Sequence, residues 1–477
     1  MKAPGRISSW MDGEDLRSIA GKGHVHFMGV AGAGMCALAE MFARSGSGIS
    51  GCDLHPGPST DRLREMNVRI YTGHEPSHLE GVTALVISAA IPGDHPEILE
   101  AARCGIPVFK RATALGKWVN QGRVLAVSGT HGKTSTTAMA AGILTIAGLN
   151  PTGLVGGYVP SWSGNFREGG ELYVVEADEY DRSFLELKPT VAIVTSVEAD
   201  HLDTYDDLEA VMTAFHEFLE ALPSDGRGII CGDDHGASRL LPALCGRGYT
   251  YGTAAGSQLR AIEIESTPEG MVFGVMEEGV DVGIVRLSAP GVHNLRNALG
   301  AAAAARFLGV DWDAIRQGLE SYQGVARRFD TIGLVGGTLV VDDYAHHPTE
   351  IAATLAAARA AHPDRRIVVV FQPHLFTRTR DFASEFGQAL AEADVVWVTD
   401  IYAAREEPIP GITGELVALE AAYRCEGKVY YHADIETLPD VVVEDLASGD
   451  LLLTMGAGSV DGVAPRIITL LEARNHA

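Results

Sequence analysis

The chain has 477 residues, of which 46% are apolar and 21% charged, so it is long enough to form several globular cores. At ~150 residues per domain, this length predicts about three domains. The formal net charge is −25 at pH 7. A strongly acidic protein is repelled by nucleic-acid backbones and anionic membranes, so we expect no nucleic-acid partner.

Neither a targeting segment nor a membrane-spanning segment is expected. The first twenty residues carry several charges and no apolar stretch, and no run of ~20 apolar residues occurs in the sequence. The six cysteines show no CxxC pair and no regular spacing, which favours small apolar side chains in a reducing compartment. We therefore expect a cytoplasmic protein without membrane insertion.

Residues 1–121 are predicted to form a Rossmann-like α/β domain. A strand leads into the turn Ala31-Gly-Ala-Gly34, a helix follows, and Asp53 lies near the end of the next strand. This order resembles a dinucleotide-binding fingerprint, in which an acid follows the glycine turn by about twenty residues. Ala31 replaces the middle glycine, however, so we expect a diphosphate near Gly32 and Gly34 but no nicotinamide. A later strand end carries Ser88, for which a plain strand cap is the alternative.

The strongest motif is Gly129-Thr-His-Gly-Lys-Thr134, which opens a predicted central domain over residues 122–323. An apolar strand precedes it and an Ala- and Met-rich helix follows, as in a P-loop ATPase-like parallel sheet. Such a turn directs backbone N–H groups and a helix N-terminus towards an anion. Lys133 would reach phosphate oxygens and the Thr134 hydroxyl would bind Mg²⁺. A tight turn with a surface lysine is the alternative, and we favour a nucleoside triphosphate site.

Two later strands of this domain end in acidic residues. The first ends at Glu176, which we expect to bind Mg²⁺ because carboxylates beside a P-loop commonly do so. The second runs into Glu198-Ala-Asp-His201, where His201 is expected to bind a second metal ion or the substrate. The other acids after the first strand are expected to be solvated loop charges: Asp178, Glu179 and Asp181.

Residues 324–477 are predicted to form a third, Rossmann-like α/β domain, because apolar strands alternate there with helices. Arg378 and Arg380 are two residues apart on a predicted loop, a spacing that suits a carboxylate or a phosphate. A pair of surface arginines is the alternative. His346 and His347 are adjacent, so at most one of them can face a given site. The predicted strands are 339–343, 366–371, 395–400 and 451–455.

Taken in chain order, these motifs resemble those of the Mur ligase family. They span residues 24 to about 460, and their joint occurrence is far more specific than any one of them. The motifs are Gly29-Val-Ala-Gly-Ala-Gly-Met35, Gly129-Thr-His-Gly-Lys-Thr134, Glu176-Ala-Asp-Glu179, Glu198-Ala-Asp-His-Leu-Asp203, His293-Asn-Leu-Arg-Asn297, Arg327-Arg-Phe-Asp330, Asp342-Asp-Tyr-Ala-His-His-Pro348, Phe371-Gln-Pro-His374 and Asp400-Ile-Tyr-Ala-Ala404. The resemblance implies three domains, which bind a UDP sugar, ATP and an amino acid.

Within the family the resemblance is closest to the alanine-adding branch. Many relatives carry a carbamylated lysine in the central domain, and the matching region 214–218 has no lysine, as in that branch. The implied reaction joins L-alanine to the lactyl carboxylate of UDP-N-acetylmuramate through an acyl phosphate, with ATP and two Mg²⁺ ions, in peptidoglycan precursor synthesis. A sibling ligase that adds a recycled peptide, glycine or serine is the alternative. We expect a monomer or a weak homodimer.

The resemblance also assigns roles to individual residues. Thr134 and Glu176 would bind the first Mg²⁺ and His201 the second. His346 and Arg380 would face the reacting centre together with Lys133. ATP would contact Gly129, Thr130, His131, Gly132, Lys133, Thr134 and Ser135, with Asn297 at the adenine, Arg328 at the phosphates and Asp343 at the ribose. The UDP sugar would contact Gly32, Ala33, Gly34, Met35, Asp53, Ser88 and Ala89.

Two other classes of protein are alternatives. A dehydrogenase built on the first glycine turn is disfavoured by Ala31 and by the second, stronger phosphate loop. A nucleotide-gated binding protein without turnover is disfavoured by the convergence of Lys133, Glu176 and His201. Three positions of the third domain depart from the family pattern: Leu375, Arg405 and Ser459.

Overall fold

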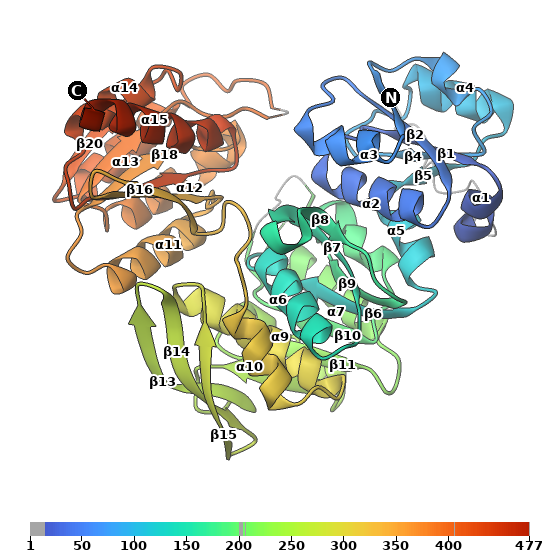
Figure 1. Cartoon of the computed structure of the whole chain (residues 1–477), viewed down its shortest axis with the longest axis horizontal. Coiled ribbons are helices and arrows are strands. Elements are labelled where there is room, and N and C mark those ends of the chain that lie inside the picture. Colours follow the sequence, from blue (N-terminus) through green and yellow to red (C-terminus); the bar gives the residue numbers. More distant parts are fainter. Residues whose placement is uncertain (1–14, 200–203, 206, 405, 477) are drawn as a thin grey trace. The chain divides into compact units, whose positions relative to one another are not determined.

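The computed structural model describes residues 15–199, 204–205, 207–404 and 406–476. Its described part contains three sheets flanked by helices, which confirms the predicted α/β class (Figure 1). The sheets have five, ten and six strands, in the orders β3-β2-β1-β4-β5, β15-β14-β13-β12-β11-β10-β6-β9-β7-β8 and β16-β17-β21-β18-β19-β20.

By its internal contacts the chain divides into two compact units. The first unit comprises residues up to Ala261 together with Val275–Val282 and Arg296–Leu319. The second comprises Ile262–Gly274, Gly283–Leu295 and Glu320–Ala477. The domain boundaries expected after residues 121 and 323 stay predictions.

The first sheet is parallel and has apolar side chains packed on both of its faces. Its order changes direction between β1 and β4, and ligands of such sheets bind at the carboxyl ends of the strands where this happens. Its strands are β1 (His24–Met28), β2 (Gly48–Asp53), β3 (Arg69–Thr72), β4 (Ala84–Ile87) and β5 (Val108–Lys110). The accompanying helices are α1 (Leu16–Lys22), α2 (Ala33–Arg44), η2 (Pro58–Thr60), α3 (Asp61–Glu65), η3 (Pro76–Leu79), α4 (Pro96–Cys104) and α5 (Arg111–Val119).

The second sheet has three adjacent parallel strands, β10-β6-β9, at the place where the phosphate loop was predicted. Their register pairs Val194 with Ser128 and Val127 with Glu176, so their carboxyl ends lie at one edge. The strands are β6 (Arg123–Ser128), β7 (Thr152–Val159), β8 (Gly164–Arg167), β9 (Leu172–Glu176), β10 (Val191–Val194), β11 (Arg227–Cys231), β12 (Gly248–Gly252), β13 (Leu259–Thr267), β14 (Gly270–Glu277) and β15 (Val280–Leu287). The helices are α6 (Lys133–Ile146), η4 (Pro160–Trp162), η5 (Tyr180–Glu186), α7 (Leu208–Glu220), α8 (His235–Ser238), η6 (Leu241–Leu244), α9 (Val292–Phe307) and α10 (Trp312–Glu320).

The third sheet is parallel except for β16, which pairs antiparallel with β17. One apolar cluster joins it to α11, α12 and α13, and another joins it to α14 and α15, so helices cover both faces. Its strands are β16 (Asp330–Val335), β17 (Thr338–Asp343), β18 (Ile367–Phe371), β19 (Val395–Val398), β20 (Lys428–Tyr431) and β21 (Leu451–Met455). The helices are α11 (Pro348–Ala361), α12 (Phe376–Leu390), α13 (Gly414–Arg424), α14 (Leu438–Asp445), η7 (Ser459–Gly462) and α15 (Val463–His476).

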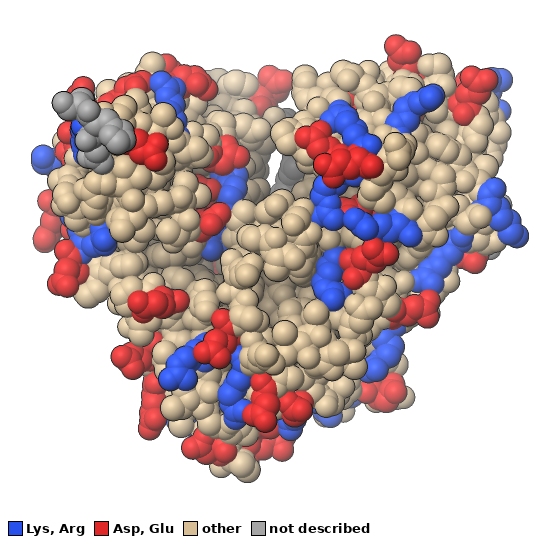
Figure 2. All heavy atoms as spheres, in the orientation of Figure 1, with Lys and Arg blue, Asp and Glu red and all other residues tan. Residues whose placement is uncertain are grey.

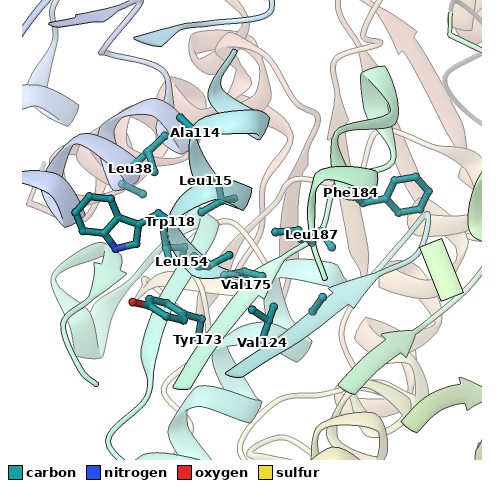
Figure 3. Close-up of a cluster of buried hydrophobic side chains, with 14 of the residues drawn as sticks. Leu38, Ala114, Leu115, Trp118, Val124, Leu154, Tyr173, Val175, Phe184 and Leu187 are labelled. Atoms are coloured by element: carbon teal, nitrogen blue, oxygen red, sulfur yellow. The ribbon is translucent and has the colours of Figure 1, made fainter. Parts of the chain in front are cut away.

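One apolar cluster crosses the expected boundary at residue 121, within the first unit (Figure 3). Leu38 and Trp118 come from the helices of the first sheet, whereas Leu154, Tyr173 and Val175 come from strands of the second. Burial of apolar side chains stabilises the packing of these elements at about 25 cal/mol per Å². This shared cluster fixes the glycine turn of the first sheet relative to the phosphate loop.

Two observations concern the expected absence of nucleic-acid and membrane partners: the distribution of surface charge and the length of the apolar helices. Acidic and basic side chains are intermixed over the face shown in Figure 2. No helix in the described part of the chain is long and apolar enough to cross a membrane.

We predict that shortening a buried side chain of strand β10 destabilises the protein strongly. Ile193 is fully buried between β6 and β11, so Ile193→Ala should lower the free energy of unfolding by about 2–5 kcal/mol. Ile284, whose exposed fraction is 55%, provides the control. Ile284→Ala should change the free energy of unfolding by less than about 0.5 kcal/mol. Urea denaturation followed by tryptophan fluorescence measures both free energies, and equal losses in the two variants would contradict the burial of Ile193.

Candidate active site

The phosphate-loop motif forms the turn between β6 and α6. Gly129 and Gly132 have φ angles of 130° and 82°, in the region that favours glycine. A Cβ atom on Gly129 would lie 2.1 Å from Thr195 Oγ1, and one on Gly132 would lie 2.4 Å from Asn297 Oδ1. Both the backbone conformation and the close neighbours therefore require glycine. Asn297, expected at the adenine, is buried and lies against this loop.

The residues after β10 hold this loop in place. The Thr130 N–H donates to the Ser196 carbonyl (2.9 Å), and the His131 N–H donates to Ser196 Oγ (3.0 Å). The Glu198 N–H donates to Thr130 Oγ1 (2.9 Å). Because the loop is fixed in advance, an anion that binds there need not order it.

Lys133 points back into the loop and forms a buried ion pair. Its Nζ donates to the Gly129 carbonyl (2.8 Å) and to both carboxylate oxygens of Glu179 (3.0 and 2.9 Å). The side chains of Lys133 and Glu179 are only 12% and 3% exposed. Burial alone would lower the pKa of Lys133, but the negative charges of Glu179 and Asp178 outweigh this effect and raise the pKa above its usual range.

The expectation that Glu179 is a solvated loop charge is therefore wrong. The chain turns sharply after β9, and the short helix η5 begins at Tyr180, directly after Glu179. The Tyr205 hydroxyl donates to the Glu179 carbonyl (2.7 Å) and helps to hold this turn. An unpaired lysine is costly to bury, and Glu179 supplies the compensating charge.

The two expected ligands of the first Mg²⁺ are brought together. Thr134 Oγ1 lies 3.1 and 3.0 Å from the two carboxylate oxygens of Glu176, and the Gly156 N–H donates to one of them (2.7 Å). A hydroxyl and a carboxylate are oxygen ligands of the kind that Mg²⁺ prefers, so the residues fit this ion. His201, expected at the second ion, lies outside the described residues.

A cavity of about 210 Å³ connects this region with the first glycine turn. Its lining includes Gly34 and Arg111 on one side and Gly156, Glu176 and Asp178 on the other. A Cβ atom on Gly34 would lie 3.1 Å from Arg111 Nη1, so glycine at this position lets the guanidinium approach the turn closely. Arg111 is not among the predicted site residues, although an arginine directly after a strand end beside a glycine turn is a usable signal for anion binding.

The first glycine turn is held by Asp53, the acid of the fingerprint. Its carboxylate accepts from the Ala31 N–H (3.0 Å) and the His55 N–H (3.0 Å). Gly32 precedes α2, and the first N–H groups of a helix have no partner within it, so they can bind an anion. Met35, the third residue of α2, is buried. The other expected residues lie at the turn or the end of β4 and are partly or fully exposed: Gly32, Ala33, Gly34, Ser88 and Ala89.

In the second unit, three predicted residues surround Glu350. Asp343 is buried at the end of β17 and accepts from two backbone N–H groups, those of Phe329 (2.7 Å) and Ala345 (2.8 Å). Burial raises the pKa of Asp343 to about 6, opposed by the positive charge of Arg328. Glu350 lies 3.8 Å from Arg328 Nη1 and 3.2 Å from His346 Nδ1. The expected ribose, phosphate and reacting-centre residues are thus neighbours.

The expectation that Arg378 and Arg380 share a loop is wrong, because both lie in helix α12. Residues two apart on a helix point to different sides. Arg378 is therefore buried, with Nη1 3.4 Å from His374 Nδ1, whereas Arg380 is exposed and pairs with Asp381 (2.7 Å). Of the two arginines, Arg378 is the one placed beside another motif residue.

Of the three departures from the family pattern, Leu375 lies in the segment between β18 and α12 and Ser459 contacts that segment. Leu375 precedes α12 with a φ of 69°, which is rare for a branched side chain. Ser459 Oγ accepts from Gln372 Nε2 (3.1 Å) at the end of β18. Arg405 lies outside the described residues.

Comparisons with known proteins identify the family of this chain. Three family models match in succession: "Mur ligase family, catalytic domain" over residues 24–123, "Mur ligase middle domain" over 127–305, and "Mur ligase, glutamate ligase domain" over 327–458. The chain belongs to the Mur ligase family. The predicted membership and the three-domain α/β class are confirmed.

Curated relatives carry one shared name. UDP-N-acetylmuramate–L-alanine ligase from Bordetella parapertussis is 44% identical over 453 residues, which cover 92% of this chain and 96% of the relative. The enzyme of the same name from Burkholderia cenocepacia is 41% identical over 460 residues, covering 94% and 98%. This is the alanine-adding branch that the motifs indicated.

Solved structures of this Mur ligase's relatives cover nearly the whole chain. UDP-N-acetylmuramate-alanine ligase from Thermotoga maritima has a TM-score of 0.82 at 27% identity, covering 95% of this chain and all of its own. A murein peptide ligase from Psychrobacter arcticus has a TM-score of 0.67 at 25% identity, covering 94% and 98%. The structure of the alanine ligase is therefore the more similar of these two.

We predict that the buried pair of Lys133 and Glu179 is strongly coupled. Glu179→Gln leaves the lysine without its principal counter-charge and should cost about 3–5 kcal/mol of stability. Adding Lys133→Met should recover part of this loss, because the uncompensated charge is then gone. Thermal and urea unfolding of both single variants and the double variant measure the coupling.

The control uses the exposed pair Lys110–Asp181, whose side chains are 56% and 41% exposed. Asp181→Asn should change stability by less than about 1 kcal/mol, since water screens this pair. Additive effects of Lys133→Met and Glu179→Gln would contradict the coupling.

Proposed function

We propose that this Mur ligase joins L-alanine to the lactyl carboxylate of UDP-N-acetylmuramate, with cleavage of ATP to ADP and phosphate. The shared name of relatives that are 41–44% identical supports the substrates. The observation that carries the chemistry is the cavity between the two glycine turns, which Gly34, Arg111 and Glu176 line. A UDP sugar bound at the first turn would extend through it towards a phosphate bound at the second.

In the first step, an oxygen of the lactyl carboxylate attacks the γ-phosphorus of ATP, and ADP leaves. The loop N–H groups and Lys133 hold the phosphates and balance the charge that moves to the leaving oxygen. Mg²⁺ bound by Thr134 and Glu176 would supply further positive charge there. The product is an acyl phosphate, a reactive mixed anhydride.

In the second step, the amine of L-alanine attacks the acyl carbon and inorganic phosphate leaves. The amine loses a proton, and an amide bond replaces the anhydride. The acyl phosphate would hydrolyse in water, so the site must exclude solvent until the amine reacts. His346 is proposed to act at the reacting centre, Arg328 at the phosphates and Asp343 at the ribose.

Lys133 would exchange partners when the nucleotide binds. Its Nζ now contacts Glu179 at 2.9 and 3.0 Å, and a phosphate in the loop would compete with this carboxylate. The exchange lets the lysine stay buried and paired in both states, which avoids the cost of an isolated charge. Asn297, beside Gly132, is proposed to contact the adenine.

The proposal also includes roles for two further residues, the domain boundaries and the oligomeric state. His201 is proposed to bind a second Mg²⁺, and Arg380 to approach the reacting centre. The proposed domains are residues 1–121, 122–323 and 324–477, which the spans of the three matching family models support. We expect a cytoplasmic monomer or weak homodimer. The sibling reaction with a recycled peptide is not favoured, because the peptide ligase is the less similar structure.

Phosphate release tests the proposal directly. With Mg²⁺ and ATP, release should require both UDP-N-acetylmuramate and L-alanine, and Lys133→Ala should reduce kcat by about 10²–10³-fold because a phosphate-binding cation is lost. Lys110→Ala, which removes an exposed lysine, should leave the rate unchanged. Release that depends on a different amine donor would overturn the alanine assignment, and release without the sugar would overturn the ligase reaction.

The proposed metal ligand allows a separate test. Glu176→Gln removes a negative oxygen ligand, so the Mg²⁺ concentration for half-maximal rate should rise about 10-fold or more. Asp181→Asn provides the control, since Asp181 is partly exposed and pairs with Lys110. A Mg²⁺ titration of the phosphate-release rate distinguishes the two, and an unchanged midpoint in Glu176→Gln would exclude this residue as a ligand.

A further inference from the structure

A second group of metal-binding side chains lies in the first sheet, outside the proposed active site. His26, Cys52, His78 and Glu97 each place one possible ligand atom within 4.8 Å of all the others. His26, Cys52 and Glu97 are fully buried, and the side chain of His78 is 8% exposed. The reaction proposed above uses none of these residues.

The strand register explains why these side chains meet. His26 on β1 pairs with Ser50 on β2, and Cys52 lies two residues further along β2, so all three point to the same face of the sheet. The helix η3 supplies His78, and the first turn of α4 supplies Glu97 over that face. Residues far apart in the chain thus converge on one buried position.

We propose that His26, Cys52, His78 and Glu97 form a binding site for one divalent transition-metal ion, with Zn²⁺ as the preferred ion. At bond lengths of about 2.3 Å to sulfur and about 2.0 Å to nitrogen or oxygen, the ligand atoms of tetrahedral Zn²⁺ lie about 3.3–3.5 Å apart. Three of the separations among these side chains are close to this value, and all four possible ligand atoms lie within 4.8 Å of one another. His26 Nε2 lies 3.2 Å from Cys52 Sγ, Cys52 Sγ 3.5 Å from Glu97 Oε2, and His78 Nδ1 3.0 Å from Glu97 Oε1.

The charges and the ligand types favour the same ion. A thiolate from Cys52 and a carboxylate from Glu97 would together balance a divalent cation, so the filled site would be neutral. Burial of a neutral set avoids the large cost of isolated charges. Sulfur and imidazole ligands favour Zn²⁺ over Mg²⁺, which prefers oxygen. The proposed active site, by contrast, offers the oxygens of Thr134 and Glu176.

The surroundings have the features of an outer ligand shell. His26 Nδ1 lies 2.8 Å from Ser50 Oγ, so the second ring nitrogen of this histidine has a hydrogen-bond partner, as metal-bound histidines usually do. Ser50 Oγ also lies 2.8 Å from His24 Nε2. His74 Nδ1, on the partly exposed segment before η3, lies 3.1 Å from Cys52 Sγ. As predicted for the cysteines, Cys52 is free and lies in an apolar core cluster, and the proposal gives it a second role.

Cobalt titration of the full-length protein tests the site. Co²⁺ in a tetrahedral site with a thiolate gives intense visible bands and a near-ultraviolet sulfur-to-metal band, whereas an all-oxygen site gives no such sulfur band. We expect one equivalent of Co²⁺ to produce both features and equimolar Zn²⁺ to abolish them. The readout needs neither nucleotide nor turnover, so it is independent of the proposed reaction.

Two variants and a control complete the test. Cys52→Ser should lose the sulfur band and His78→Ala should lower the affinity for Co²⁺ by 10-fold or more, each checked for folding by circular dichroism. Cys231 is also buried, and Cys231→Ser should keep the wild-type spectrum. Absence of a sulfur band in the wild-type protein, or a band that persists in Cys52→Ser, would overturn the proposal.

Discussion

The alignment of three parallel strands is the constraint on which the proposed active site depends. The strands β10, β6 and β9 are neighbours in register, so the residues after each strand emerge at one edge of the sheet. The phosphate loop follows β6, the acidic turn follows β9, and the segment that braces the loop follows β10. None of these segments could assemble the site alone, because each supplies one type of group: backbone N–H donors, carboxylates or bracing hydrogen bonds.

Buried charge is the second organising feature. Lys133 is largely buried, and burial of its ammonium group costs desolvation free energy. The ion pair with Glu179 and the hydrogen bond to the Gly129 carbonyl offset this cost. The same principle is visible at Asp343, whose buried carboxylate accepts two backbone N–H groups beside Arg328. In the proposed function, Lys133 would exchange Glu179 for a phosphate, whereas Asp343 would contact the uncharged ribose. A site built in this way remains folded before the substrates bind.

The first sheet combines two different kinds of ligand chemistry. At the carboxyl end of β1, a glycine turn and a helix N-terminus offer N–H groups to an anion, and Asp53 secures the turn. On one face of the same sheet, Cys52 joins two imidazoles and a carboxylate. Because Cys52 and Asp53 are consecutive on β2, an ion bound at the first would help to fix the strand end that carries the second.

The sequence by itself determined the features that depend on local order: the three α/β segments, the glycine turns, and the pairing of Thr134 with Glu176. These follow from residue periodicity and from motifs whose spacing has a chemical reason. The short edge strands β8, β16 and β20 were missed, because a strand of four to six residues with mixed polarity carries little periodic signal. The tertiary structure alone decided which acid neutralises Lys133, which of two arginines is buried, and that His26, Cys52, His78 and Glu97 meet. Those outcomes depend on strand register and on the course of the turns. Residues that come together from distant parts of the chain have no characteristic spacing in the sequence, so no motif predicts their contact.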